Sequence, residues 1–364
     1  MGIKYFDGKK YKRWENLFPF KDNLPQDKSV NIPKVYDKLL DKKSRYIFEK
    51  RLLASIIDDE RYIEDIIREG TYIQQVKRLF QSENYIYGAG RRLDFAMWLF
   101  YGVTWKGIID QKKTSDYEGI KIKRLEEYCI SNDAVVLVTL KEGTKEVMDK
   151  LLEKGIKAEN IIILNDVIKE VHENTYFDDE IFCQKRQDVK GVFIDAGCYD
   201  GMDTIKAKAY FPNIDKVVSF EPDPENYEKC KKNLNKQENV ELYNKGLSDH
   251  QGEEYIVTDG VASHIASEGS NRIVVDSIDD IFRSEKVGFI KMDIEGSEYD
   301  ALNGAEAIIK KYTPCMAISV YHKKSDIWRI PVKILEIEDS YSFYLRHYST
   351  SWGDTVLYAV DAAI

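Results

Sequence analysis

The chain has 364 residues, which is long for a single hydrophobic core, so two domains are the default expectation. Its net charge of -9 and pI near 5.3 argue against a nucleic-acid backbone as the partner. The longest apolar stretch, residues 95–103, is too short to span a membrane, and no signal-peptide core follows the basic residues 1–13. Five scattered cysteines without a C-x-x-C pair predict reduced thiols in a cytoplasmic protein, with no disulfide framework or zinc site.

Residues 1–80 are predicted to form a helical lead-in. Residues 46–57 and 61–80 carry apolar side chains at i, i+3, i+4 intervals, which is typical of amphipathic helices. This segment contains no cluster of side chains suited to chemistry. We expect it to pack on one of the two domains or on a second subunit, as the contact of a homodimer.

A smaller Rossmann-like α/β domain is predicted for residues 81–170. Short apolar strands alternate there with helices, which predicts a parallel sheet. The turn Gly88-Ala89-Gly90 begins like a nucleotide-binding loop, but Leu93 replaces the third glycine. Two interpretations stay open: a scaffold that binds no ligand, or a site for NAD or a nucleotide sugar, with Arg91 and Arg92 near a phosphate. The polar, acidic residues 171–190 are then predicted to be a linker.

The most informative motif opens the second domain, predicted for residues 191–364. An apolar strand ends at Asp195 and is followed by a loop with glycines at 197 and 201. A second strand, residues 216–220, ends at Glu221. Glycine lets the backbone approach a ligand, and a carboxylate closing the second strand can bind both hydroxyls of an adenosine ribose.

The spacing of this loop indicates which adenosine it accepts. A dinucleotide site has G-x-G-x-x-G, whereas this loop reads D-x-G-x-x-x-G and contains Tyr199, Asp200 and Asp203. Acids repel a pyrophosphate but suit the ammonium and sulfonium of S-adenosylmethionine. The alternative is an ordinary turn of a doubly wound sheet.

Two further strand ends carry candidate catalytic residues. The apolar strand 288–292 runs into Asp293 and Glu295, and the strand 314–320 delivers His322. Ligands of open α/β sheets collect at such strand ends. Transfer of a methyl group to a hydroxyl requires removal of a proton, and one of these carboxylates or His322 could serve as the base. A divalent metal held by the same set is the second interpretation, and no metal ligand is predicted.

With these motifs in order, residues 190–360 resemble the FkbM-type methyltransferase family. The resemblance rests on the loop from Asp195 to Thr204, on Phe-Glu-Pro at 220–222, on Leu-Ser-Asp at 247–249, on residues 275–279, and on residues 290–298 followed by Leu-Asn-Gly-Ala at 302–305. It implies a class I methyltransferase fold that uses S-adenosylmethionine. It further implies an acceptor hydroxyl on a sugar, glycoconjugate or related natural product.

Roles for the individual residues follow from this interpretation. Asp195 is expected under the methionine end of the cofactor, with Gly197 and Gly201 giving clearance, and Glu221 on the ribose. Lys245 and Gly246 follow the third strand and are expected near the adenine. The predicted cofactor-binding residues are Asp195, Gly197, Tyr199, Gly201, Glu221, Lys245, Gly246 and Asp293. The competing hypotheses are an enzyme centred on Gly88–Gly90 and a non-catalytic interaction module.

Overall fold

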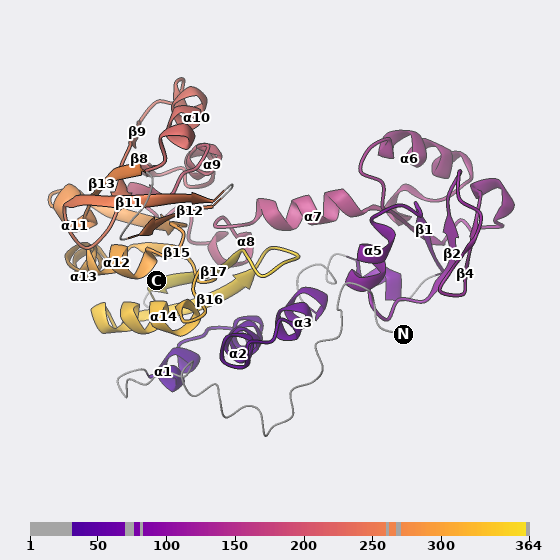
Figure 1. The fold of residues 1–364 in the computed structure, drawn as a ribbon, viewed down its shortest axis with the longest axis horizontal. Helices are drawn as coiled ribbons and strands as arrows, with labels where there is room; N and C mark the ends of the chain where they lie inside the picture. The colour runs from indigo at the N-terminus through magenta and orange to yellow at the C-terminus, as the bar shows by residue number, and fades with distance from the viewer. Residues whose placement is uncertain (1–30, 70–75, 81–82, 260–261, 267–270, 362–364) are drawn as a thin grey trace. The chain divides into compact units, whose positions relative to one another are not determined.

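The computed structural model describes residues 31–69, 76–80, 83–259, 262–266 and 271–361 (Figure 1). Contacts divide this part of the chain into two units. The first comprises residues 64–173, and the second combines residues 31–63 with residues 174–361. Among the described residues, no helix is long and apolar enough to cross a membrane.

The first unit contains a six-stranded sheet in the order β3-β4-β2-β1-β5-β6, parallel throughout except for the β3–β4 pair. β1 (Asn84–Tyr87) and β5 (Val135–Val138) are buried along their whole length, as expected for strands covered on both faces. This is the smaller Rossmann-like domain expected from the sequence. Its other elements are most of α3 (Arg61–Glu69), then η3 (Lys77–Phe80), α5 (Leu93–Leu99), β2 (Trp105–Ile109), β3 (Asp116–Tyr117), β4 (Ile120–Lys123), η4 (Leu125–Glu127), α6 (Thr144–Glu153), η5 (Ala158–Asn160), β6 (Ile161–Ile163) and α7 (Leu164–Glu173).

The second unit is built on a seven-stranded sheet in the order β16-β17-β15-β14-β7-β8-β9. The five strands from β15 to β9 are parallel, and β17 runs antiparallel to both of its neighbours. The strands are β7 (Gly191–Ala196), β8 (Ile214–Phe220), β9 (Val240–Tyr243), β14 (Val287–Met292), β15 (Cys315–Ser319), β16 (Tyr341–His347) and β17 (Thr355–Asp361).

The chain reverses its direction of winding at β7, because β8 pairs with one edge of β7 and β14 with the other. Open α/β sheets bind ligands outside the carboxyl ends of the strands at such a reversal. The helices near the sheet include α9 (Met202–Tyr210), which contacts β7 and β8, and α13 (Glu306–Tyr312), which contacts β14. The remaining helices are α1 (Ile32–Asp37), α2 (Lys42–Ile57), α8 (Asp179–Phe182), α10 (Pro224–Leu234), α11 (Ile278–Ile281), α12 (Glu298–Asn303) and α14 (Asp326–Ile337).

A small second sheet is inserted between β9 and α11 in the chain. Its order is β10-β13-β11-β12, with β10 (Gly246–Leu247), β11 (Gly252–Asp259), β12 (Ala262–Ala266) and β13 (Asn271–Asp276). All four strands lie between residues 246 and 276. Residues 260–261 and 267–270 of that stretch lie outside the described residues.

The predicted linker, residues 171–190, differs from the structure, because from Asn174 onward it belongs to the second unit. Phe177 stacks on Phe193 of β7 with ring centroids 6.4 Å apart, and Phe182 meets Phe289 of β14 edge-on at 5.6 Å. Both side chains of this stretch are almost completely buried. The sequence does not reveal this buried contact, because the two aromatic residues stand among acidic residues and form no periodic apolar pattern.

The predicted helical lead-in is not one segment in the structure, because its described residues up to Ile63 belong to the second unit and those from Glu64 onward to the first. α1 and α2 belong to the second unit: the N–H of Leu40 donates to the carbonyl of Phe343 at 2.9 Å, and Asp41 pairs with Arg346 at 2.7 Å. Arg51 of α2 is 1% exposed, and its Nε donates to Thr355 Oγ1 at 2.8 Å. Residues 1–30, 70–75 and 81–82 of the predicted N-terminal segments lie outside the described residues.

Candidate active site

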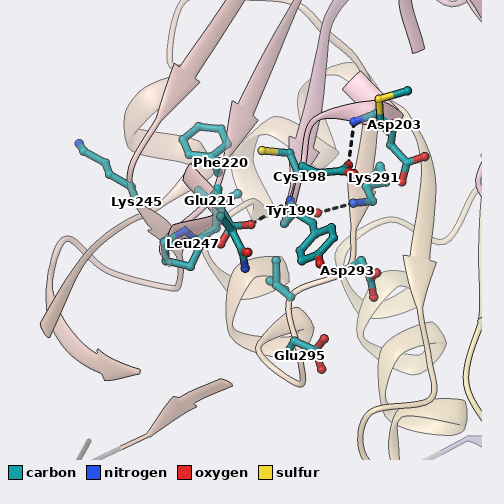
Figure 2. A pocket seen from close by; sticks show the side chains of 17 residues that line it. Cys198, Tyr199, Asp203, Phe220, Glu221, Lys245, Leu247, Lys291, Asp293 and Glu295 are labelled. Atoms are coloured by element: carbon teal, nitrogen blue, oxygen red, sulfur yellow. Dashed lines mark hydrogen bonds between the residues drawn. The ribbon is translucent and has the colours of Figure 1, made fainter. Parts of the chain in front are cut away.

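A cavity of about 470 Å³ opens at the carboxyl ends of β7, β8 and β14, where the winding reverses (Figure 2). Its wall is formed by the ends of these strands and the loops that follow them, by the starts of α9 and α10, and by residues 245–247 after β9. The lining residues are Gly197, Cys198, Tyr199, Asp200, Met202, Asp203, Phe220, Glu221, Pro222, Asn226, Lys245, Gly246, Leu247, Lys291, Asp293, Ile294 and Glu295.

The loop after β7 passes close to the loop after β14 because residue 197 is glycine. A Cβ built on Gly197 would lie 1.9 Å from the carbonyl oxygen of Asp293, and the residue has φ +78°. Tyr199 also has positive φ, at +50°, and is 49% exposed at the cavity. The backbone therefore forms this part of the cavity wall, as a close-fitting ligand requires.

Glu221 follows β8 directly and is held by the backbone on both carboxylate oxygens. Its Oε2 accepts the N–H of Tyr199 and its Oε1 that of Asp223, each at 2.9 Å. Burial raises the pKa of Glu221 to about 7, against the opposing effect of these two hydrogen bonds. Figure 2 shows the Glu221 carboxylate beside Tyr199 within the cavity.

Asp195 does not line the cavity; it lies fully buried beneath it. Its Oδ2 accepts the hydroxyl of Thr204 at 2.6 Å, and its Oδ1 lies 3.0 Å from the Nζ of Lys291 on β14. Lys291 is 2% exposed and donates to the carbonyl of Gly197 at 2.6 Å. Burial lowers the pKa of Lys291, but Asp195, Asp203 and Asp293 outweigh it and hold that pKa above its ordinary value.

Of the other predicted cofactor-binding residues, Lys245 and Gly246 line the cavity and Gly201 does not. Gly201 begins α9 with φ +82° and packs toward Cys230 and Leu234 rather than lining the cavity. Gly246 and Lys245 line it. The Lys245 ammonium, however, donates to Asp276 at 3.0 Å.

Asp293 and Glu295 both line the cavity from the loop after β14 (Figure 2). The chain leaves strand geometry here, since Glu295 has φ +54° and Gly296 φ +97°. The hydroxyl of Tyr321 donates to Asp293 Oδ1 at 3.2 Å. Burial raises the pKa of Asp293, but Lys291, His322 and the hydroxyls of Ser319 and Tyr176 outweigh it and hold that pKa below its usual value.

His322 lies behind the cavity wall and does not line it. Its Nε2 is 3.4 Å from Asp293 Oδ1 and 3.4 Å from Glu295 Oε2, and its Nδ1 is 2.9 Å from Oε1 of the fully buried Glu298. Burial lowers the pKa of His322, but the hydrogen bond and charge of Glu298, with Asp293 and Glu295, raise it to about 9. The structure therefore brings the three predicted catalytic residues together, with His322 as a cation at neutral pH.

Several residues at the site were not among the predicted site residues, and Asp203 was expected only as an acid of the loop after β7. Asp203 lines the cavity with a pKa raised to about 6 by burial, and Tyr176 lies 3.1 Å from Ser319 through its hydroxyl. Glu298, the first residue of α12, accepts the N–H of Ile294 as well as contacting His322. Lys291 could have been found, because a charged residue within an apolar strand requires a partner.

In the first unit, the carboxylate of Asp110 is hydrogen-bonded to the Gly88–Gly90 loop. Asp110, at the end of β2, accepts the backbone N–H groups of Ala89, Lys112 and Lys113 at 2.8–2.9 Å. Lys113 Nζ donates to the carbonyl of Ala89 at 2.5 Å. The strand-end acid that would bind a ribose in a dinucleotide site is therefore engaged by the loop itself.

The strand order, with an antiparallel β17 between β15 and β16, and the cavity at β7 define a class I methyltransferase fold. Residues 195–348 match the family model described as the methyltransferase FkbM domain. This part of the chain is therefore a methyltransferase domain of the FkbM family.

Solved structures of methyltransferases also resemble the chain. The methyltransferase FkbM of Methylobacillus flagellatus KT is 18% identical, with 86% of this chain and 99% of that chain covered at a TM-score of 0.42. SMU.1697c of Streptococcus mutans, in complex with SAH, is 16% identical over 47% of this chain and 88% of that chain, with a TM-score of 0.31. Aeropyrum pernix fibrillarin, with bound S-adenosyl-L-methionine, is 11% identical over 53% and 74%, with a TM-score of 0.33. No match was found among curated proteins.

Proposed function

We propose that the protein is an S-adenosylmethionine-dependent O-methyltransferase that acts on a hydroxyl of a sugar, glycoconjugate or related natural product. The observation that carries this proposal is the position of Glu221. Its carboxylate follows β8 and lines the cavity beside the Gly197 loop, whose Tyr199 N–H it accepts at 2.9 Å. A buried carboxylate with free lone pairs at this strand end suits the two hydroxyls of an adenosine ribose.

The charges of the cavity fit the cationic end of the same cofactor. Five carboxylates line it, whereas its two lysines are paired with carboxylates outside the lining, Lys291 with Asp195 and Lys245 with Asp276. Such a wall favours the ammonium and sulfonium of S-adenosylmethionine and disfavours a pyrophosphate. The lining acids are Asp200, Asp203, Glu221, Asp293 and Glu295.

S-adenosylmethionine supplies an electrophilic methyl group when it is bound. The residues of this chain would position the acceptor hydroxyl and remove its proton. Glu295 suits the second task, since its carboxylate lines the cavity and is 36% exposed. His322 does not suit it, because its raised pKa keeps the imidazole protonated.

Binding of the cofactor can be tested by calorimetric titration of the full chain with S-adenosylmethionine, S-adenosylhomocysteine and NAD. We expect both sulfur compounds to bind and NAD not to. Glu221→Ala should abolish that binding, and Glu221→Gln should weaken it. Glu146→Ala, on the exposed face of α6, is the matched control. Binding of NAD alone would overturn the cofactor assignment.

The acceptor class can be tested with methyl-labelled S-adenosylmethionine. Transfer to mono- and oligosaccharides is compared with transfer to amine and carboxylic acid acceptors. We expect label in a base-stable ether linkage, and at least a hundredfold loss of rate in Glu295→Gln, because general base catalysis contributes about 10²–10⁴-fold. Label found only on nitrogen or on carboxyl groups would contradict O-methylation of a hydroxyl.

A further inference from the structure

Three carboxylates surround the imidazole of His322 in the second unit. Nε2 lies 3.4 Å from an oxygen of Asp293 and 3.4 Å from an oxygen of Glu295, while Nδ1 lies 2.9 Å from Glu298. The side chain of His322 is 7% exposed and that of Glu298 is 0% exposed. Three negative charges thus face one ring that can carry at most one positive charge.

Of the neighbouring lysines, Lys291 offsets part of this excess, because its positive charge stabilises the carboxylate of Asp293. Its ion pair, however, is with the buried Asp195, and Lys323 directs its Nζ to the carbonyl of Gly296. A fourth carboxylate, Asp326, is 2% exposed and accepts the backbone N–H of Lys323 at 2.8 Å. This excess of negative charge is balanced better by a divalent cation than by one proton on the ring.

Two buried atoms of the cluster lack hydrogen-bond partners. They are Nε2 of His322 and Oε2 of Glu298. The 3.4 Å contacts of Nε2 with Asp293 and Glu295 are therefore close approaches without a hydrogen bond. Buried polar atoms are nearly always paired, so an orphaned ring nitrogen between two carboxylates points to a missing ligand.

We propose that Asp293, Glu295 and His322 Nε2 bind a divalent cation of the Mn²⁺ and Mg²⁺ class. Donor atoms on one such cation, with bonds of about 2.1 Å, lie about 3.0–3.4 Å apart, which matches the spacing of Nε2 from each carboxylate. Two carboxylates with one imidazole favour Mn²⁺ over a thiolate-seeking metal.

Glu298 is the positioning residue of this site. A histidine that ligates a metal donates its other ring N–H to a carboxylate, which fixes the tautomer with Nε2 free to bind. Glu298 Oε1 accepts from Nδ1 at 2.9 Å and is itself held by the N–H of Ile294 at the same distance. The ring is therefore oriented from the loop that also carries Asp293 and Glu295.

The site adjoins the cavity, because Asp293 and Glu295 line it while His322 lies behind them. A cation there presents open positions to two neighbouring oxygens of an acceptor and makes a bound hydroxyl more acidic. This role, unlike the binding of the metal, rests on the proposed O-methyltransferase function. Glu295 would bind the cation through Oε2, the oxygen that lies 3.4 Å from Nε2.

The test uses the full chain, freed of metal with EDTA and titrated with MnCl₂ while free Mn²⁺ is followed by electron paramagnetic resonance. We expect one Mn²⁺ per chain, displaced by excess MgCl₂. Pulsed spectra of the bound ion should show coupling to ¹⁴N of the imidazole. Absence of bound Mn²⁺ at millimolar concentration, or of the nitrogen coupling, overturns the proposal without recourse to a variant.

Variants then assign the ligands. His322→Gln should weaken Mn²⁺ binding more than a hundredfold, and Glu298→Gln tenfold or more, as for other partners of ligating histidines. His250→Gln is the matched control, because His250 is an exposed histidine 2.8 Å from Asp249 and 3.8 Å from Glu254. Unchanged Mn²⁺ binding in His322→Gln, or equal loss in His250→Gln, overturns the site.

Binding of S-adenosylhomocysteine in the presence of EDTA separates this inference from the proposed function. His322→Gln should retain that binding within a few-fold, which also shows that the variant is folded. Wild-type protein that binds Mn²⁺ but not S-adenosylhomocysteine would overturn the proposed function and leave the metal site standing.

Discussion

The ammonium of Lys291 lies 3.0 Å from the carboxylate of Asp195, and both side chains are almost completely buried, Lys291 in the cavity wall and Asp195 beneath it. The two residues are in register on β14 and β7, the central strands of the sheet. The same ammonium donates to the carbonyl of Gly197. One ion pair therefore joins the two strands and supports the loop that forms the cavity wall.

Removal of the ammonium should destabilise the second unit strongly. We expect Lys291→Met to lower the free energy of unfolding by about 3–5 kcal/mol, because Asp195 is left as an uncompensated buried charge. The measurement is urea denaturation followed by tyrosine and tryptophan fluorescence. In the double variant with Asp195→Asn the loss should be smaller, since no buried charge remains. A double variant less stable than Lys291→Met would show that the ion pair is not the cause.

The affinity for the adenosine part of the ligand should depend on the ionisation of Glu221. Its pKa is raised to about 7 by burial, so the carboxylate gains a proton as the pH falls through 7 and loses a lone pair for a ribose hydroxyl. We expect affinity to fall by up to about tenfold per pH unit below 7 and to level off above 8. Methylthioadenosine, which has the ribose but no amino acid group, is the appropriate ligand for calorimetry between pH 5.5 and 8.5. Glu221→Gln should give weak binding without this pH dependence.

The same shift affects stability with a defined sign. Because the pKa of Glu221 is higher in the folded than in the unfolded protein, ionising this residue disfavours the folded state. Its contribution to the free energy of unfolding therefore falls as the pH rises from about 4.5 to 7. Bound ligand should reverse part of that loss, because it gives the carboxylate further hydrogen-bond donors. A stability profile identical in wild type and Glu221→Gln over this range would argue against the shifted pKa.

Gly197 is expected to tolerate no side chain. In Gly197→Ala the new Cβ would meet the carbonyl oxygen of Asp293 at 1.9 Å, and φ +78° disfavours any residue with a Cβ. The loops after β7 and β14 must separate, so we expect binding of S-adenosylhomocysteine to weaken more than tenfold. Gly90→Ala is the control, since nothing lies within 4 Å of its added Cβ. Equal affinity of the two variants would contradict a close-packed loop in the site.

Much of the second unit was predictable from its sequence, because the polar residues of the site directly follow apolar strands that are easily recognised. Glu221, Asp293 and the Gly197 loop each follow a buried apolar strand, and parallel strands place such residues at one edge of the sheet. Tyr176 was missed because it stands among acids with no periodic pattern, although it is 4% exposed near Ser319. Likewise, nothing local in the sequence places α2 against β16, since that contact depends on tertiary packing.

Substitution of Asp110 should affect the stability of the first unit without affecting ligand binding by the second. Burial raises the pKa of Asp110, but the N–H groups of Ala89, Lys112 and Lys113, with the Lys113 charge, hold the pKa below its usual value. Its contribution to stability is thus present above about pH 4 and lost as the pH falls through the lowered pKa. We expect Asp110→Ala to lower the free energy of unfolding by about 1–2 kcal/mol at pH 7, because loop N–H groups are left unpaired. The affinity for S-adenosylhomocysteine should stay within twofold of wild type.

If Asp110 instead binds a ribose, the wild type would bind NAD or a nucleotide sugar in calorimetry and Asp110→Ala would not. That outcome would restore the Gly88–Gly90 loop as a ligand site, because the carboxylate would then have exchanged its loop contacts for the ligand.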